Sequence, residues 1–253
     1  MLPPLRNTTP VASAAGIRLH EGRCLAVAAL DASDAAELHL LLRAAREANA
    51  DAVRVSLPSD PALRWADLAG ECGALGIPLL PSITSLEEAR SVRAAGLRWV
   101  KIGSSFASNR PLLREAAALF DALIVSIGGL DDVEVEKTAS VLRHEEKPFA
   151  LLHREPSSGA PAALDRRRME WLRGLAPEIG IADHTADLAV AEGASAWGAR
   201  FFEKHLSTTA TADRPHAADP TRFRALAKVL AQHSYGRRRR ETPGGASDGP
   251  VSD

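Results

Sequence analysis

Along the chain, short apolar runs alternate with segments in which apolar residues recur every three or four positions. The second pattern is typical of helices with one buried face, and residues 34–50 and 110–120 show it. The short runs predict buried strands, because polar turns bound them. We find eight such runs, at residues 24–30, 52–57, 77–83, 99–103, 122–128, 148–153, 179–183 and 200–206.

Alternating strands and helices predict a parallel sheet, because each helix returns the chain to the same edge of the sheet. Eight strand–helix units predict a single (β/α)8 barrel, an α/β fold of the TIM-barrel type. The structural rival is a doubly wound open sheet, which usually has about five or six strands and often a glycine-rich turn after the first. Residues 29–36, at the first turn, contain no glycine, so we expect the barrel.

We expect one folded domain with loose ends, and place the barrel at residues 17–234. Residues 1–16 are Pro, Thr and small residues without a period, and residues 235–253 combine four consecutive arginines with Gly, Pro, Ser and Asp. Both compositions predict disorder. The arginine block, Arg237–Arg240, fits a solvated tail better than an anion-binding hook.

Composition narrows the class of protein. The chain has 253 residues, 45% of them hydrophobic and 25% charged, with a formal net charge of −1. This balance gives no electrostatic basis for binding nucleic acid or an anionic membrane. No apolar run is long enough to span a membrane, and the start lacks the order of a signal peptide. The two cysteines, Cys24 and Cys72, are too few for a disulfide framework. We expect both to be reduced residues that pack in the core of a cytoplasmic protein.

Polar side chains lie at the C-terminal ends of several predicted strands, where the active sites of (β/α)8 barrels form. Cationic and imidazole groups would converge there, which suits an anionic, phosphorylated substrate and a divalent metal. The candidates are Arg54, Ser56, Lys101, Ser104, Ser105, Ser126, Gly128, Gly129, His153, Asp183, His184, Thr185, Glu203, Lys204 and His205.

Several of these residues also have a purely structural interpretation. Lys101 and Glu203 could simply form an ion pair with each other. His153 and His184, on adjacent strands, are either ordinary hydrogen-bonded histidines or ligands of a Mn, Fe, Co or Zn ion. The turn at Gly128 is either only tight or presents backbone N–H groups to a phosphate.

Several segments occur in the order and rhythm of one known enzyme family. Residues 180–185 (GIADHT) and 202–206 (FEKHL) are similar to a G-x-S-D-H-T turn and an I-E-K-H-F strand, and this pair resembles the sialic acid synthase family. The resemblance extends over roughly residues 24–232. Weaker similarities lie at residues 100–104, 109–113, 125–129, 151–153 and 214–216.

This resemblance implies a reaction, a metal and a set of roles. The reaction would condense phosphoenolpyruvate with an N-acyl hexosamine aldehyde, giving a sialic-acid-like 2-keto sugar acid. A divalent metal, Mn²⁺ or Mg²⁺, held by His153 and His184, would polarise the aldehyde. Small molecules would be the substrates and a homodimer the assembly. Catalytic roles would fall to Lys101, Asp31 and Glu203, and substrate binding to Arg54, Ser104, Ser126, Gly128, Asp183 and Lys204.

The sequence also departs from the family pattern. The family's first strand ends in A-E-I-G-x-N-H-N-G, but here neither the glutamate nor Asn-His-Asn occurs, and Asp31 is the nearest substitute. Phe106 replaces a carboxylate, and Arg54 stands where the family usually has lysine, which changes reach and hydrogen-bond geometry. We also expect the family's antifreeze-like C-terminal domain to be absent.

These departures motivate two further hypotheses. The first is a catalytically degenerate barrel that binds a phosphorylated ligand or a partner subunit without turnover. The second is a different lyase or aldolase, which would need Lys101 or Lys204 as a Schiff-base lysine with a pKa lowered by desolvation.

Overall fold

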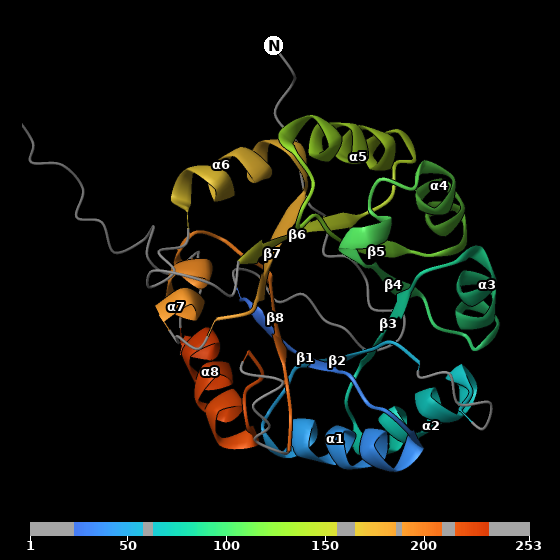
Figure 1. Cartoon of the computed structure of the whole chain (residues 1–253), viewed down its shortest axis with the longest axis vertical. Helices are drawn as coiled ribbons and strands as arrows, with labels where there is room; N and C mark the ends of the chain where they lie inside the picture. Colours follow the sequence, from blue (N-terminus) through green and yellow to red (C-terminus); the bar gives the residue numbers. More distant parts are fainter. Residues whose placement is uncertain (1–22, 58–62, 156–164, 186–188, 209–215, 233–253) are drawn as a thin grey trace, which may run out of the picture.

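The computed structural model describes residues 23–57, 63–155, 165–185, 189–208 and 216–232. Within them, eight parallel strands close into a barrel in chain order, and a helix follows each strand on the outside (Figure 1). The predicted (β/α)8 TIM barrel is therefore confirmed. The tails predicted to be disordered, residues 1–16 and 235–253, lie outside the described residues.

The strands and helices follow the predicted order. The strands are β1 Leu25–Leu30, β2 Ala52–Val55, β3 Leu79–Ile83, β4 Trp99–Ile102, β5 Ala122–Ser126, β6 Phe149–Glu155, β7 Glu178–Asp183 and β8 Phe201–His205. The α-helices are α1 Ala35–Glu47, α2 Trp65–Leu75, α3 Leu86–Ala94, α4 Arg110–Leu119, α5 Asp132–His144, α6 Arg166–Leu175, α7 Ala189–Ala196 and α8 Pro220–Gln232. A short 3₁₀ helix, Ser104–Phe106, follows β4.

Polar side chains define where several helices begin. Asp34 accepts a hydrogen bond from the backbone N–H of Glu37 at 2.9 Å, and Asp131 accepts one from Glu134 at 2.8 Å. Before α8, Asp219 accepts from the backbone N–H of residues 221 and 222 at 2.8 and 2.9 Å. Such caps satisfy N–H groups that the first helical turn leaves without partners. These local rules explain why the sequence pattern located the helices.

The strands are buried on both faces, because helices cover the outside and side chains fill the inside. Trp99 and Phe201 help to form the floor of the barrel, with ring centroids 6.5 Å apart. Gly180 allows this packing, since a Cβ there would lie 2.6 Å from the carbonyl oxygen of Phe201. Cys24 and Cys72 are buried and free. Among the described helices, none has the length and apolar character that crossing a bilayer requires.

Candidate functional site

Above this floor, at the C-terminal ends of the strands, the barrel opens into a cavity of about 320 Å³. Inward-facing residues occupy alternate strand positions, so Trp99 at the floor is followed by Lys101, and Phe201 by Glu203. The lining is strongly polar. It comprises Arg54, Ser56, Ser82, Thr84, Lys101, Gly103, Ser104, Ser105, Phe106, Ser126, Arg154, Ala182, His184, Glu203 and His205.

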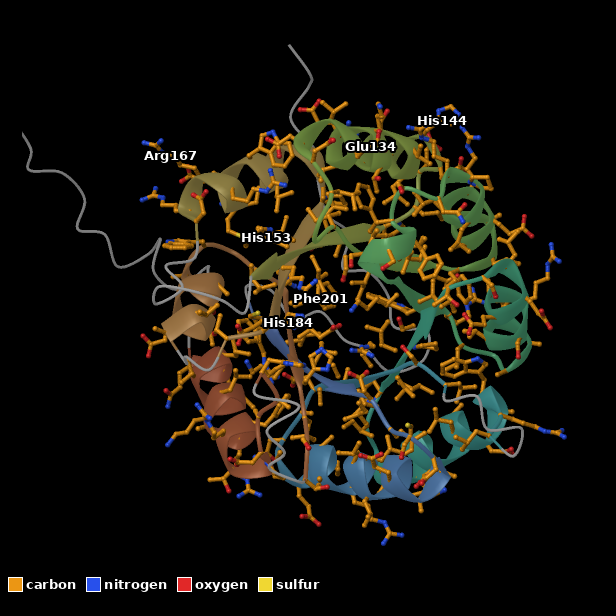
Figure 2. The ribbon with its side chains drawn as sticks, in the orientation of Figure 1. Glu134, His144, His153, Arg167, His184 and Phe201 are labelled. Carbon is orange, nitrogen blue, oxygen red and sulfur yellow. The ribbon has the colours of Figure 1, made fainter. Side chains whose placement is uncertain are left out.

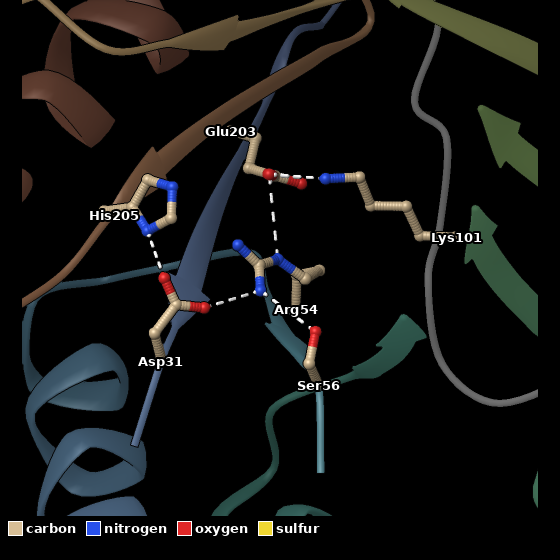
Figure 3. A network of polar contacts seen from close by, with 6 residues as sticks. All are labelled: Asp31, Arg54, Ser56, Lys101, Glu203 and His205. Carbon is tan, nitrogen blue, oxygen red and sulfur yellow. Dashed lines mark hydrogen bonds and ion pairs between the residues drawn. The ribbon is translucent and has the colours of Figure 1, made fainter. Parts of the chain in front are cut away.

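An ion-pair network crosses the cavity, buried at Arg54, Lys101 and Glu203 and exposed at Asp31 (Figure 3). Lys101 Nζ donates to Glu203 Oε1 at 2.6 Å, and Arg54 Nε lies 3.7 Å from the same oxygen. Arg54 Nη1 also donates to Asp31 Oδ1 at 2.8 Å. Asp31 Oδ2 in turn lies 2.7 Å from His205 Nδ1. Ion pairs thus connect β2, β4, β8 and the turn after β1. The structure brings together the three residues that we expected to be catalytic, Lys101, Asp31 and Glu203.

The charges in this network fix one another's protonation. Burial by itself would raise the pKa of Glu203, but Lys101 and Arg54 more than offset it and hold that pKa at about 2. Burial lowers the pKa of Lys101, although Glu203 opposes this effect. For Asp31, burial is outweighed by His205 and Arg54, so its pKa lies well below the ordinary value. Asp31 is therefore a carboxylate at neutral pH and holds no proton to donate.

Three polar atoms at the cavity are buried and have no hydrogen-bond partner within the described part of the chain: Arg54 Nε, Ser126 Oγ and Glu203 Oε2. A buried polar atom without a partner costs about 1–3 kcal/mol. A polar ligand in the cavity could satisfy such atoms. Ser104 lines the same cavity, so both serines expected to bind substrate are available to a ligand there.

Arg154 is a cavity residue that the sequence pattern did not indicate. It adds a third cation to Arg54 and Lys101. Its side chain crosses Gly128, where an added Cβ would lie 2.6 Å from Arg154 Cβ. Gly128 thus makes room for Arg154, a steric role beside the two interpretations that the sequence left open, a tight turn or a phosphate-binding backbone. Because every residue from Phe149 to Leu152 in β6 is apolar, no alternation marked Arg154 as inward-facing.

The structure corrects the expected position of His153. In β6, Ala150 and Leu152 belong to the inner core and Leu151 to the outer one, so His153 faces outward. Burial and the nearby Arg168 of α6 lower the pKa of His153. In Figure 2, His153 lies on the side of β6 toward α6, whereas His184 lies nearer the barrel axis. The two expected metal ligands therefore lie on opposite faces of the sheet.

Asp183 and Lys204 also lie on the outer face, away from the cavity in which we expected them to bind substrate. Lys204 is paired in register with Asp183 on one side and with Ala28 of the outer core on the other. Its Nζ donates to Asp183 Oδ2 at 2.8 Å and to the carbonyl of Thr185. Asp183 Oδ1 accepts from the backbone N–H of Thr185 at 2.8 Å. This pair holds the end of β7 and leaves Lys204 outside the cavity.

Three histidines gather beside the cavity: His184 after β7, His205 at the end of β8, and His216 before α8. Their ring centroids are 5.0 to 5.4 Å apart. One nitrogen from each lies within 4.8 Å of the others, which makes them a candidate metal-binding group among the described residues. Burial, followed by His205 and Arg154, lowers the pKa of His184 to about 4. Burial and His205 lower the pKa of His216 as well.

Curated proteins similar to this chain include two sugar-acid synthases. The N-acetylneuraminate-9-phosphate synthase of Drosophila melanogaster is 26% identical over 174 residues, which cover 66% of this chain and 47% of that protein. The N,N'-diacetyllegionaminic acid synthase of Campylobacter jejuni is 27% identical over 164 residues, which cover 62% of this chain and 49% of that protein. The chain thus spans about half the length of these relatives.

Solved structures agree with the fold. The sialic acid synthetase of Leptospira borgpetersenii superposes with a TM-score of 0.77 at 18% identity, over 95% of this chain and 92% of that one. The DAHP synthase of Thermotoga maritima superposes with a TM-score of 0.71 at 14% identity, over 87% of this chain and 72% of that one. At such identities the likeness establishes the barrel only. The family is established separately, because the NeuB family model matches residues 46–237, and the chain therefore belongs to the NeuB family.

Proposed function

We propose that the chain condenses phosphoenolpyruvate with an amino-sugar aldehyde to form a sialic-acid-like 2-keto sugar acid. The observation that carries this proposal is the cationic cavity at the mouth of a NeuB-family barrel, where Arg54, Lys101 and Arg154 converge. The names of the two curated relatives support the same class of product.

The residues of the cavity suit the anionic substrate. Phosphoenolpyruvate carries a carboxylate and a phosphate, and guanidinium groups bind both through paired hydrogen bonds. Arg154 is exposed and reaches the cavity from β6, whereas Arg54 and Lys101 are buried deeper. Three cations face two carboxylates, Asp31 and Glu203, which leaves excess positive charge for the ligand. Ser104 and Ser126 supply neutral hydrogen bonds.

The carboxylates orient the cations. Glu203 holds Lys101, and Asp31 holds both Arg54 and His205. A divalent metal, when bound, would polarise the aldehyde of the acceptor as a Lewis acid. Lys101, whose pKa burial lowers, is the group best placed to exchange a proton with the bound substrate. These assignments give Lys101 the catalytic role and make Asp31 a positioning residue.

A second candidate function is binding without turnover. The observation in its favour is that both expected catalytic carboxylates are engaged in ion pairs at 2.6 and 2.8 Å. Such pairing holds Glu203 and Asp31 ionised, so neither serves as a general acid. The two candidates differ in one measurable property, which is release of phosphate.

The test is phosphate release from phosphoenolpyruvate by the full chain, with divalent metal and a panel of N-acyl hexosamines. Both free sugars and their 6-phosphates belong in the panel, because one relative is named for a 9-phosphate product. We expect multiple turnovers that need an acceptor and consume one water, with a product whose mass is that of the two substrates plus water less phosphoric acid. Lys101→Ala should abolish turnover, and His144→Ala, on the exposed face of α5, should not.

Two results would contradict the proposal, the first its site and the second its reaction. Turnover that persists in Lys101→Ala would remove the proposed site. Stabilisation of the fold by phosphoenolpyruvate, with no turnover for any acceptor, would establish the second candidate.

A further inference from the structure

We propose that Arg154 forms a second anion subsite at the rim of the cavity, and that the acceptor of this chain is an acidic amino sugar, bearing a phosphate ester or a carboxylate. This inference rests on the proposed function and deepens it, since it names the charge of the acceptor and the residue that selects it.

Gly128 and the strand register fix the direction of the Arg154 side chain. A Cβ built on Gly128 would lie 2.6 Å from Arg154 Cβ, 3.3 Å from its Cγ and 2.8 Å from its Cδ. The aliphatic part of Arg154 therefore lies flat against Gly128, in the turn after β5. On its other side, Arg154 pairs in register with Ala182 of β7, which also lines the cavity. These two small neighbours leave room for a ligand group beside the guanidinium.

Arg154 differs from the other two cations of the cavity in its pairing. Arg54 lies against Asp31 and Glu203, and Lys101 against Glu203. In the described part of the chain, Arg154 forms no ion pair with a carboxylate. A guanidinium is ionised at any pH at which the protein is folded. The charge of Arg154 is therefore available to an anionic ligand.

Arg154 also lies farther from the barrel floor than the groups that would hold a deeply bound anion. Ser126, whose Oγ has no hydrogen-bond partner among the described residues, pairs in register with Leu152. Arg154 is two residues beyond Leu152, which is about 7 Å farther along β6. Arg54, Lys101 and Ser126 are each only 6% exposed, whereas Arg154 is exposed. The cavity can therefore hold one anion at its base and another at its rim.

The chemistry of a sugar acceptor places its acidic group at the rim. The aldehyde carbon, C1, must meet phosphoenolpyruvate deeper in the cavity, so C6, at the other end of the sugar chain, would point outward. A phosphate or a carboxylate on C6 offers the paired oxygens that a guanidinium binds through two parallel hydrogen bonds. Arg154 would thus orient the acceptor as well as select it, and it is a specificity-determining residue.

The first experiment compares acceptors that differ only at C6. Phosphate release by the full chain, with phosphoenolpyruvate and divalent metal, is measured for an N-acyl hexosamine, its 6-phosphate and the corresponding 6-carboxylate. We expect kcat/KM to be about 10-fold or more higher for one of the acids than for the neutral sugar, because a charged hydrogen bond is gained. The two acidic arms distinguish a phosphate ester from a carboxylate. A ratio near one for both acids overturns the proposal.

Variants assign the preference to Arg154. Arg154→Gln should lower the acid-to-neutral ratio of kcat/KM about 10- to 100-fold, and Arg154→Lys, which keeps the charge, should lower it less. The ratio is used because any effect on phosphoenolpyruvate is common to both acceptors and cancels. Arg154→Met, which keeps an unbranched side chain over Gly128, replaces Arg154→Gln if thermal unfolding shows that the latter is not folded.

The matched control is Arg167→Gln. It removes the same charge from the exposed outer face of α6, away from the cavity (Figure 2). The acid-to-neutral ratio of this variant should equal that of the wild type. An equal fall in Arg167→Gln and Arg154→Gln, or no fall in Arg154→Gln, overturns the proposal.

A binding measurement separates the subsite from the reaction. The sugar alcohols of the same acceptors have no aldehyde and cannot condense, so their binding to the full chain is followed by calorimetry. We expect the acidic alcohol to bind about 10-fold or more tightly than the neutral one, also with phosphoenolpyruvate present. The difference should shrink as salt increases, because Arg154 is exposed. Displacement of phosphoenolpyruvate by the acidic alcohol would overturn a second subsite.

The two proposals can therefore fail independently. Tighter binding of the acidic alcohol that depends on Arg154, without turnover of any acceptor, supports the subsite, and only the proposed function fails. Turnover without any preference for an acidic acceptor supports the proposed function and overturns the subsite.

Discussion

Two buried lysine–carboxylate pairs lie back to back in the wall of this barrel. Lys101 and Glu203 face the cavity at 2.6 Å, while Lys204 and Asp183 face the helices at 2.8 Å. Glu203 and Lys204 are consecutive residues of β8, and successive strand residues point to opposite faces. The inner pair adjoins a ligand cavity and shares Arg54. The outer pair is enclosed and joins β7 to β8, which makes it a structural element.

The largest expected effect follows from breaking the outer pair. Asp183→Ala leaves the Lys204 ammonium buried without its carboxylate and the Thr185 N–H without its acceptor. We expect a loss of about 3–5 kcal/mol of unfolding free energy, measured by urea denaturation. Asp132→Ala, which removes the exposed partner of Arg168, should cost only about 0–1 kcal/mol. Equal losses in the two variants would contradict the comparison.

The inner pair should make stability depend on pH. The ordinary pKa of Glu203 is 4.5 and its folded value is about 2, so unfolding takes up a proton between these values. Since one unit of pKa corresponds to about 1.4 kcal/mol, Glu203 contributes about 3 kcal/mol above pH 4.5, lost as pH falls toward 2. Unfolding free energies measured from pH 6 to 2 should fall less steeply in Glu203→Gln. An unchanged slope would show that Glu203 is not held ionised.

The two lysines should differ in their effect on ligand affinity. Lys101→Met should weaken phosphoenolpyruvate binding about 10- to 100-fold, because a hydrogen bond to a charged group contributes about 1.5–3 kcal/mol. Lys204→Met, provided that it is folded, should bind the ligand as the wild type does. Calorimetric titration checks both, and a loss of affinity in Lys204→Met would place that residue at the cavity after all.

We expect the smallest change in stability from a substitution at Gly128, the glycine against which the Arg154 side chain packs. Gly128→Ala places a Cβ 2.6 Å from Arg154 Cβ, which should cost about 1–3 kcal/mol of unfolding free energy and displace the guanidinium. The control is Gly70→Ala on the exposed face of α2, where a Cβ meets nothing within 4 Å. That change should stabilise the helix by about 0.5–1 kcal/mol. Thermal unfolding that ranks the two variants in the opposite order would contradict this packing.

The hydrophobic pattern predicted the barrel because strands and helices are local structures whose periodicity is written in neighbouring residues. It also located Arg54, Lys101, Ser126, His184 and Glu203 at strand ends, since the last residues of parallel strands meet at one edge. The Lys101–Glu203 ion pair was foreseen as one alternative. The pattern did not predict that His153, Asp183 and Lys204 lie on the outer face of the barrel. It also did not predict that Arg154 lines the cavity.

The residue pattern along the chain was enough to predict the number of strand–helix units, the start of helices such as α8 and the edge of the barrel at which polar side chains lie. Which residue of each polar run faces the cavity became clear only from the folded barrel. The physical reason is that strands covered on both faces carry apolar residues on both faces. The sequence of such a strand therefore does not show which alternate residues point inward and which point outward. The approach of His216 to His205 likewise depends on backbone pairing between Leu206 and Ala218, residues twelve positions apart.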